Sequence, residues 1–326
     1  MMRRLAALSL AVLLGCTDRS SAPLAPDAEG DLDLSAALLN SQKSSSTASY
    51  GYTTIAYPGA VTTIAWGINA RGDVVGEYFD NVGRRHGFLL RDEVFTTIDV
   101  PGALTSARGI SPGGAIVGVY RQPTESAVSA HGFLFTRQGE LVTGVDFPGH
   151  INTIPQRILP DGTILGCRHD NDLMGSMRGI AMERSGNSEI EAFASMNNGA
   201  TPDQSRIVGL WTNMMAEGGA RSEGYVIDNG QFSSFVVPGS NFTQAWDVNP
   251  AGEVVGVQRT GTAFHGFVLT AAGDYVAIDF PEATATRAQG INARGDVVGS
   301  YVKGGKTSGF LARRTNSQDP PGDRRD

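Results

Sequence analysis

The chain has 326 residues, with 33 acidic and 26 basic side chains and a formal net charge of −7. An acidic chain lacks the basic field that nucleic-acid binding requires, so we expect no nucleic-acid partner. Cysteine is present only at Cys16 and Cys167, so apart from Cys16 the chain has a single thiol and no intrachain disulfide is expected.

The first residues have the pattern of an export signal. Two arginines at positions 3–4 precede an apolar run, residues 5–14, which is too short to span a bilayer. The run ends in Gly15-Cys16, which resembles the lipobox of bacterial lipoproteins, where the cysteine is acylated and becomes the new N-terminus. This resemblance implies a signal peptide over residues 1–15, lipidation at Cys16, and a membrane anchor at the outer membrane or cell surface. The alternative is an ordinary signal peptide that happens to contain a cysteine.

Residues 16–50 are rich in Ser, Ala, Asp and Pro without periodicity, which predicts a flexible tether. The sequence of residues 314–326 predicts a disordered tail. Between them, residues 51–313 form one repeated body.

One sequence pattern recurs six times in that body. It begins Gly-Ile-Asn-Ala-Arg-Gly-Asp-Val-Val-Gly at Gly67 and returns almost unchanged at Gly290, with diverged copies starting at Gly109, Arg157, Ala200 and Asp247. A period of 40 to 50 residues is typical of folds built from stacked units, because one such unit cannot bury its own apolar face.

Each unit reads as four short strands. In the second unit the strands are predicted at residues 106–110, 115–120, 131–136 and 141–147, rich in Val, Ile, Phe and Tyr and separated by Gly/Pro turns. The first turn of each unit has type I preferences, as in Asn69-Ala-Arg-Gly72, whereas the fourth copy, taken as Pro202-Asp-Gln-Ser205, is eroded.

The sixth unit stops after its third strand, at Phe310-Leu311. Its missing fourth strand is predicted at the other end of the body, because residues 54–59 match residues 97–102. An N-terminal strand that completes the last sheet would close a ring. We therefore predict an all-β fold, a six-bladed β-propeller of four-stranded blades.

These repeats resemble the HAF family of bacterial extracellular repeats, named for a His-Ala-Phe triplet. The triplet here is His-Gly-Phe at His86, His131 and His265, and it departs further in the other three units. The resemblance covers residues 51–313 and implies secreted, propeller-like proteins, most without an assigned activity.

Loops between the second and third strands vary most, and variation on one face of a repeat array marks the working face. The residues directly before these loops form an equivalent set that we predict to bind ligand: Tyr78, Tyr120, Arg168, Trp211, Gln258 and Tyr301. Aromatic faces suit sugar rings, and Arg168 suits a carboxylate or phosphate. The alternative is that these are ordinary strand aromatics at the blade edges.

Other repeated side chains are expected to be structural. A threonine set at the start of strand 1 is assigned to local backbone bonding: Thr63, Thr105, Thr153, Thr243 and Thr286, with Met196 in the fourth unit. The three repeat histidines are assigned to hydrogen bonding within blades, and Asp99, Asp146 and Asp279 to capping the Pro turns. Cys167 is expected to be a buried, inert thiol.

The segment Arg168-His169-Asp170-Asn171-Asp172 is the densest polar cluster. It suggests a metal ligand set, but a solvated loop is the preferred interpretation, and we expect no metal and no cofactor.

Three functions remain open. The sequence favours a lipid-anchored, monomeric, non-enzymatic binding module for a glycan or protein. The second is a polysaccharide lyase or hydrolase using Tyr120, Arg168 and His169 as acid, charge neutraliser and base. The third is a purely structural surface protein.

Overall fold

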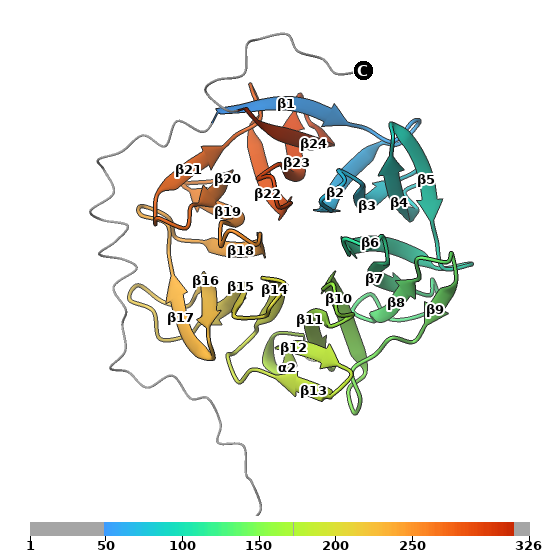
Figure 1. Ribbon diagram of the computed structural model, residues 1–326, viewed down its shortest axis with the longest axis horizontal. Coiled ribbons are helices and arrows are strands. Elements are labelled where there is room, and N and C mark those ends of the chain that lie inside the picture. The colour runs from blue at the N-terminus through green and yellow to red at the C-terminus, as the bar shows by residue number, and fades with distance from the viewer. Residues whose placement is uncertain (1–48, 172, 316–326) are drawn as a thin grey trace, which may run out of the picture.

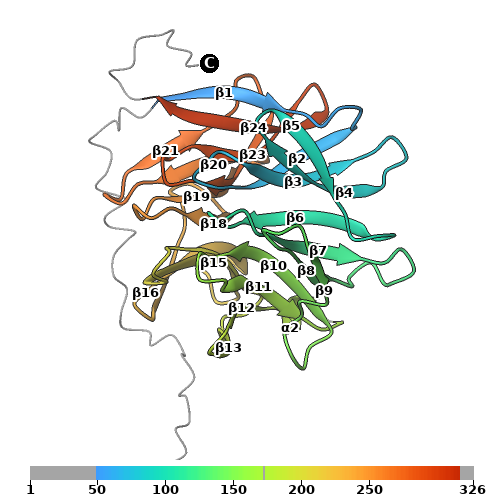
Figure 2. The ribbon, with the colours of Figure 1, turned by 45° about the vertical axis from the view of Figure 1, so that its right-hand side comes forward.

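The computed structural model describes residues 49–171 and 173–315, and it is a six-bladed β-propeller (Figure 1). Six four-stranded antiparallel sheets surround one axis, and the strand nearest the axis is the first strand of each repeat (Figures 1 and 2). The predicted fold is therefore confirmed.

The blades follow the chain in order. Blade 1 comprises β2 (Thr62–Ile68), β3 (Val74–Phe79), β4 (Arg85–Arg91) and β5 (Val94–Ile98). Blade 2 comprises β6 (Leu104–Ile110), β7 (Ile116–Arg121), β8 (His131–Phe135) and β9 (Leu141–Thr143). Blade 3 comprises β10 (Asn152–Ile158), β11 (Ile164–His169), β12 (Arg178–Glu183) and β13 (Gly186–Glu189), with the short helix α2 (Leu173–Ser176) before β12. Blade 4 comprises β14 (Met196–Ala200), β15 (Arg206–Asn213), β16 (Arg221–Asp228) and β17 (Gln231–Phe235). Blade 5 comprises β18 (Thr243–Val248), β19 (Val254–Thr260), β20 (Ala263–Leu269) and β21 (Tyr275–Ile278). Blade 6 comprises β22 (Ala285–Ile291), β23 (Val297–Lys303), β24 (Lys306–Thr315) and β1 (Ser49–Ile55).

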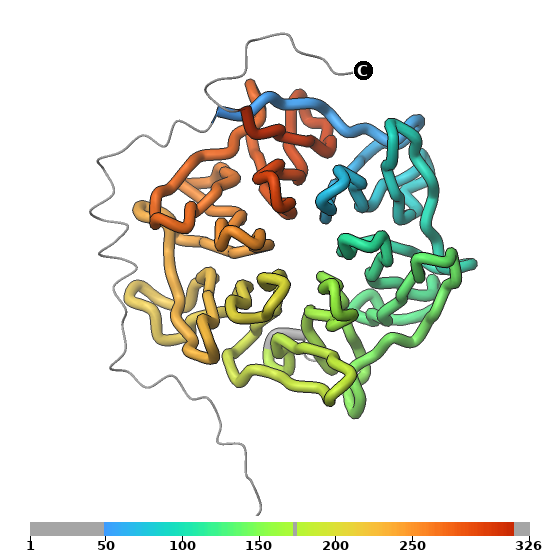
Figure 3. The backbone as a smooth tube through the Cα atoms, viewed as in Figure 1, coloured from blue at the N-terminus to red at the C-terminus, as the bar shows by residue number. Residues whose placement is uncertain are grey.

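Closure by the N-terminal strand is as predicted. Strand β1 pairs antiparallel with β24, from Ser49 opposite Thr315 to Ile55 opposite Gly309. The first strand thus lies outermost on the last blade (Figure 3). The paired strands extend two residues beyond each end of the predicted body, 51–313.

The third-strand triplet supplies the centre of each blade's core. The last residue of the triplet is fully buried in every blade: Phe88, Phe133, Ile180, Tyr225, Phe267 and Phe310. In the five blades where this residue is aromatic, its ring lies against the glycine of the second strand. A Cβ at Gly76 would meet the Ile64 carbonyl oxygen at 2.1 Å and the Phe88 ring at 2.6 Å, so this position accepts only glycine.

The His–Asp pairs join the third strand to the chain after the fourth. His86 Nδ1 lies 2.7 Å from Asp99 Oδ2, and the equivalent distances are 3.1 Å for His131–Asp146 and 3.0 Å for His265–Asp279. The histidines therefore hydrogen-bond within blades, as expected. The prediction that the aspartates cap the Pro turns is wrong, because their carboxylates are engaged with the third strand. Asp146 Oδ1, for example, accepts from the Gly132 N–H at 2.8 Å.

The threonines hold the Pro turns instead. Each of the five predicted threonines accepts a hydrogen bond from the N–H of the residue directly before a Pro, at 2.8 to 3.1 Å. Their assignment to backbone bonding is confirmed.

The register predicted for the fourth repeat is wrong by one residue. The structural equivalent of Thr63 is Ser195, not Met196, and that of Gly67 is Gly199, not Ala200. The reason lies in the first turn of blade 4, where four residues separate Thr201 from Arg206, one more than separate Asn69 from Asp73. Gln204, with φ of 58°, takes the place that Gly72 holds in blade 1.

Candidate ligand site on the propeller axis

Each innermost strand carries a β-bulge at the same place. The extra residue lies between two register positions in all six blades, and these residues form what we call the bulge ring: Trp66, Arg108, Gln156, Asn198, Trp246 and Gln289. Bulges re-aim side chains and often lie next to functional sites. Here they bring residues from six repeats to one level of the axis.

Directly below the bulge ring, two charged side chains cross the axis. The next residue in each inner strand is glycine in four blades but Arg157 in blade 3 and Asp247 in blade 5, and Arg157 Nη2 lies 3.0 Å from Asp247 Oδ2. The guanidinium also donates to the carbonyls of Arg108 (2.9 Å), Trp66 (3.2 Å) and Gln289 (2.6 Å). We call this arrangement the axial tie. It contacts five blades and fills the axis at this level.

Glycine makes room for the axial tie. A Cβ on Gly109 would lie 2.8 Å from Arg157 Cα, and one on Gly199 would lie 2.6 Å from Asp247 Oδ1. These repeat glycines are therefore required by the close approach of the inner strand of the next blade, and at Gly199 also by the Asp247 carboxylate.

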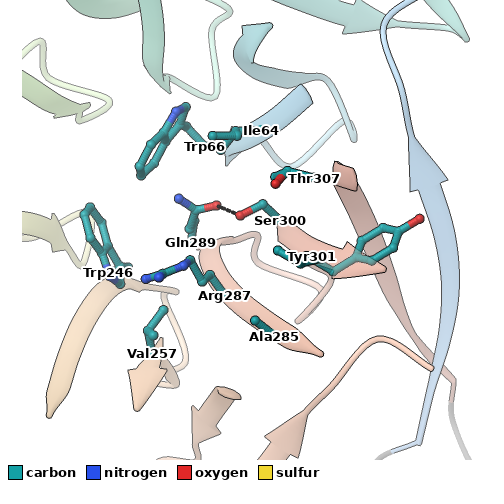
Figure 4. A pocket seen from close by; sticks show the side chains of 11 residues that line it. Ile64, Trp66, Trp246, Val257, Ala285, Arg287, Gln289, Ser300, Tyr301 and Thr307 are labelled. Atoms are coloured by element: carbon teal, nitrogen blue, oxygen red, sulfur yellow. Dashed lines mark hydrogen bonds between the residues drawn. The ribbon is translucent and has the colours of Figure 1, made fainter. Parts of the chain in front are cut away.

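Above the tie, on the face of the variable loops, lies a pit of about 410 Å³, which we call the axial pit. Its walls come from three blades: Ile64 and Trp66 of blade 1, Trp246 and Val257 of blade 5, and Ala285, Arg287, Gln289, Ser300, Tyr301, Val302 and Thr307 of blade 6. Figure 4 shows the two tryptophans on one side and blade 6 across from them. Small side chains on blade 6, such as Ala285 and Ser300, leave the space open. The volume is within the range of about 300–1,000 Å³ found for small-molecule sites.

The walls combine flat apolar faces with polar groups. The rings of Trp66 and Trp246 are 5.4 Å apart at an interplanar angle of 50°. The Gln289 amide oxygen accepts from Ser300 Oγ at 3.3 Å. Arg287 stacks on Phe264, with Cζ 3.7 Å from the ring centroid, and burial lowers the pKa of its guanidinium.

Several buried polar atoms of the bulge ring have no hydrogen-bond partner among the described residues. They are Trp66 Nε1, Arg108 Nε, both polar atoms of the Gln156 amide, and Asn198 Oδ1. The Arg108 guanidinium instead lies 3.8 Å over the Trp66 ring, and burial lowers its pKa to about 10. Native proteins leave few such groups unpaired, so a cluster of them calls for an explanation.

The ligand-binding set predicted from the sequence lies one strand farther from the axis, and we call it the outer set. Tyr78 stacks on Tyr57 and Tyr301 on Phe280, both with centroids 3.6 Å apart. Their hydroxyls lie 3.1 Å from Thr97 Oγ1 and 2.9 Å from Thr54 Oγ1. Of the set, only Tyr301 contributes to the wall of the pit, and its ring points away from the tryptophans (Figure 4).

The other members are also engaged within their blades. Tyr120 lies beside His131, with ring centroids 5.5 Å apart, and Trp211 meets Phe232 edge to face at 5.5 Å. Gln258 is buried. Arg168 forms a bidentate pair with Glu189, at 2.7 and 2.8 Å.

The three residues considered for lyase chemistry have separate partners. His169 is 1% exposed, and its Nδ1 lies 2.8 Å from the carbonyl oxygen of Asp170. Arg168 is engaged with Glu189, and Tyr120 belongs to the neighbouring blade. Among the described residues, no hydrogen bond, ion pair or ring contact joins Tyr120 to Arg168 or His169.

The polar segment that begins at Arg168 does not have the arrangement of a metal site in its described part. Asp170 pairs with His150, whose Nδ1 lies 3.2 Å from Asp170 Oδ2, and Asp172 lies outside the described residues. Within residues 49–171 and 173–315 no group of three His, Cys, Asp or Glu side chains is placed to hold a metal ion.

Sequence reasoning missed the axial pit. The signal was present, because Trp66 and Trp246 occupy the same place in the repeat, directly before the positions of Gly67 and Asp247. The predicted set lies at strand ends, whereas the variation that builds the pit lies in the middle of the first strand.

Comparisons with known proteins bear on the fold. No family model matches the chain, and no curated protein gives a significant match. Among solved structures, TolB from Acinetobacter baumannii is 14% identical with a TM-score of 0.51, over 78% of this chain and 64% of that one. A protein of unknown function from Dyadobacter fermentans is 12% identical with a TM-score of 0.52, over 81% and 98%. A gluconolactonase from Xanthomonas campestris is 12% identical with a TM-score of 0.48, over 84% and 99%. At these identities the likeness concerns the fold alone.

No helix within the described part of the chain is long and apolar enough to cross a membrane.

Proposed function

We propose that this protein is a non-enzymatic binding module of the cell envelope, which holds a small ligand or one unit of a glycan in the axial pit. The observation that carries the proposal is the composition of the pit: two tryptophans and a polar wall surround about 410 Å³, next to buried polar atoms that have no partner among the described residues. Binding sites have this combination of apolar walls and a few placed polar groups.

A catalytic role is less well supported. The axial tie fills the axis below the pit, and the arginine and histidine considered for lyase chemistry are already engaged. Among the described residues that line the pit there is no acid, histidine or cysteine to act as a general base.

The location of the protein is a second part of the proposal. The leader and Gly15-Cys16 support an exported lipoprotein anchored at Cys16, although both lie outside the described residues, and the repeats support membership of the HAF-like extracellular proteins. A Cys16→Ser variant is expected to move from the membrane fraction to the soluble fraction. Unchanged membrane association of that variant would contradict the anchor.

Binding is tested by thermal-shift screening of the protein against mono- and oligosaccharides and small acids. We expect at least one ligand to raise the Tm, and the shift to be lost in Trp66→Phe. Trp211→Phe is the matched control, because Trp211 packs in blade 4 away from the pit. A shift that is lost in Trp211→Phe and kept in Trp66→Phe would place the ligand at the outer set instead.

A further inference from the structure

The charge of the axial pit differs from that of the chain as a whole. The protein has a formal net charge of −7, yet among the described residues no acidic side chain lines the pit, whereas Arg287 does. The walls therefore form a local positive site within an acidic molecule.

The Arg287 guanidinium faces the pit and has no hydrogen-bond acceptor among the described residues. No hydrogen bond or ion pair of its guanidinium is found among the described residues, although its Cζ is held 3.7 Å over the Phe264 ring. The half-buried side chain is thus oriented by stacking while its N–H donors remain unused. A planar guanidinium held in this way matches a carboxylate, which accepts two parallel hydrogen bonds.

The remaining walls indicate what carries the carboxylate. Trp66 and Trp246 offer flat apolar faces, on which a sugar ring or an aromatic ring stacks. Gln289 is fixed by Ser300, and its NH₂ group points away from Ser300, toward the side of the pit where the tryptophans lie (Figure 4). Ser300 and Thr307 add hydroxyl groups to the wall. These hydrogen-bonding groups favour a hydroxylated ring over a plain aromatic acid.

We infer that the axial pit binds a uronic acid unit, with Arg287 pairing the carboxylate, Gln289 donating to ring oxygens, and the two tryptophans covering the ring. This inference deepens the proposed function and depends on it.

Calorimetric titrations of the full chain with sodium galacturonate, galactose and sodium benzoate test the inference. We expect galacturonate to bind more tightly than either of the others. Arg287→Gln is expected to weaken galacturonate binding about 10-fold or more, as the loss of a charge-assisted hydrogen-bonded pair implies, and to leave the affinity for galactose unchanged.

Arg259→Gln is the matched control. Arg259 also lies near the Phe264 ring, with Cζ 5.9 Å from its centroid, but it is not part of the pit. It should bind galacturonate as the wild type does, and the Tm of both variants establishes that they fold.

The outcomes separate the two claims. Equal binding of galacturonate and galactose, unaffected by Arg287→Gln but lost in Trp66→Phe, would overturn the inference and keep the pit as a binding site. Preferred binding of benzoate would overturn the sugar assignment. No binding to any probe, here and in the wider screen, would overturn the proposed function as well.

Discussion

Arg168 and Glu189 illustrate how a single side chain can look available in the sequence and be fully engaged in the fold. The two groups lie 21 residues apart and form a bidentate ion pair across blade 3. The Arg168 guanidinium, more than the opposing effect of burial, lowers the pKa of Glu189 from its ordinary value of 4.5. The pair therefore stabilises the blade and withdraws Arg168 from the ligand chemistry predicted for it.

This pair predicts a pH dependence. Because the pKa of Glu189 is lowered in the folded state, its stabilising contribution is complete above the ordinary value and is lost as the pH falls through the lower, folded value. Glu189→Gln should therefore reduce the free energy of unfolding at pH 7 and have less effect as the pH falls below 4.5. Urea denaturation across this range measures it, with Glu140→Gln as an exposed control. An effect of Glu189→Gln that is the same at every pH would contradict the assignment.

Cys167 gives a second prediction for one residue. Its thiol is completely buried, and burial raises its pKa to about 12, so the reactive thiolate is scarce at neutral pH. In a Cys16→Ser background, we expect no reaction with a thiol reagent at pH 8 until the protein is unfolded. Stoichiometric modification of the native protein would contradict this.

Among the strands, the bulged inner strand carries the greatest constraint, because its glycines lie against the inner strand of the next blade. In β14 the glycine after the bulge, Gly199, lies against Asp247 of β18. Strand β14 can lie this close to β18 only because Gly199 lacks a Cβ.

Gly199→Ala should therefore destabilise the protein. Its Cβ would lie 2.6 Å from Asp247 Oδ1 and 2.9 Å from Asp247 Cα, so backbone must move. We expect a loss of about 1–3 kcal/mol in the free energy of unfolding, as overpacking usually costs. Gly51→Ala in β1, where a Cβ meets nothing within 4 Å, is the control and should change stability by less than about 0.5 kcal/mol. Equal stabilities of the two variants would contradict this account of the inner strand.

Elements with a strong local signal were predictable. The turn at Asn69 is an example. The Asn69 side chain accepts from the N–H groups of Arg71 and Asp73, so the five residues from Asn69 to Asp73 are enough to predict the turn. The register of blade 4 was not predictable from its turn, because the turn has one added residue and Gln204 at a positive φ in place of the usual glycine. The axial pit was not predictable from local pattern, since Trp66, Trp246 and Arg287 meet only once the ring is closed.

In the whole molecule, two sets of contacts hold the ring together, one at the rim and one on the axis. At the rim, β1 completes blade 6 by pairing with β24. The ring centroid of Tyr52 lies 5.7 Å from that of Phe280 and 6.1 Å from that of Phe310. On the axis, Arg157 and Asp247 join blades that are not neighbours. The ring is thus held both by its final strand and across its centre.

The axial tie makes a prediction on global stability. Asp247→Asn would leave the buried Arg157 without its counter-charge, and removal of one partner of a buried ion pair typically costs about 3–5 kcal/mol. Asp228→Asn is the matched control, since Arg206 and Asp228 form a more exposed pair at 2.6 Å for which about 0–1 kcal/mol is expected. Urea denaturation of both variants measures the difference. A cost for Asp247→Asn no larger than that for Asp228→Asn would contradict the role of the tie.

The central claim is that ligand binds in the axial pit, and the chain's three tryptophans allow a direct test by intrinsic fluorescence. In Trp211→Phe both remaining emitters line the pit, whereas in Trp66→Phe/Trp246→Phe the single emitter belongs to the outer set. Titration with a ligand identified by screening should change the emission of Trp211→Phe with saturation and leave that of the double variant unchanged. A saturable change in the double variant with none in Trp211→Phe would contradict the claim.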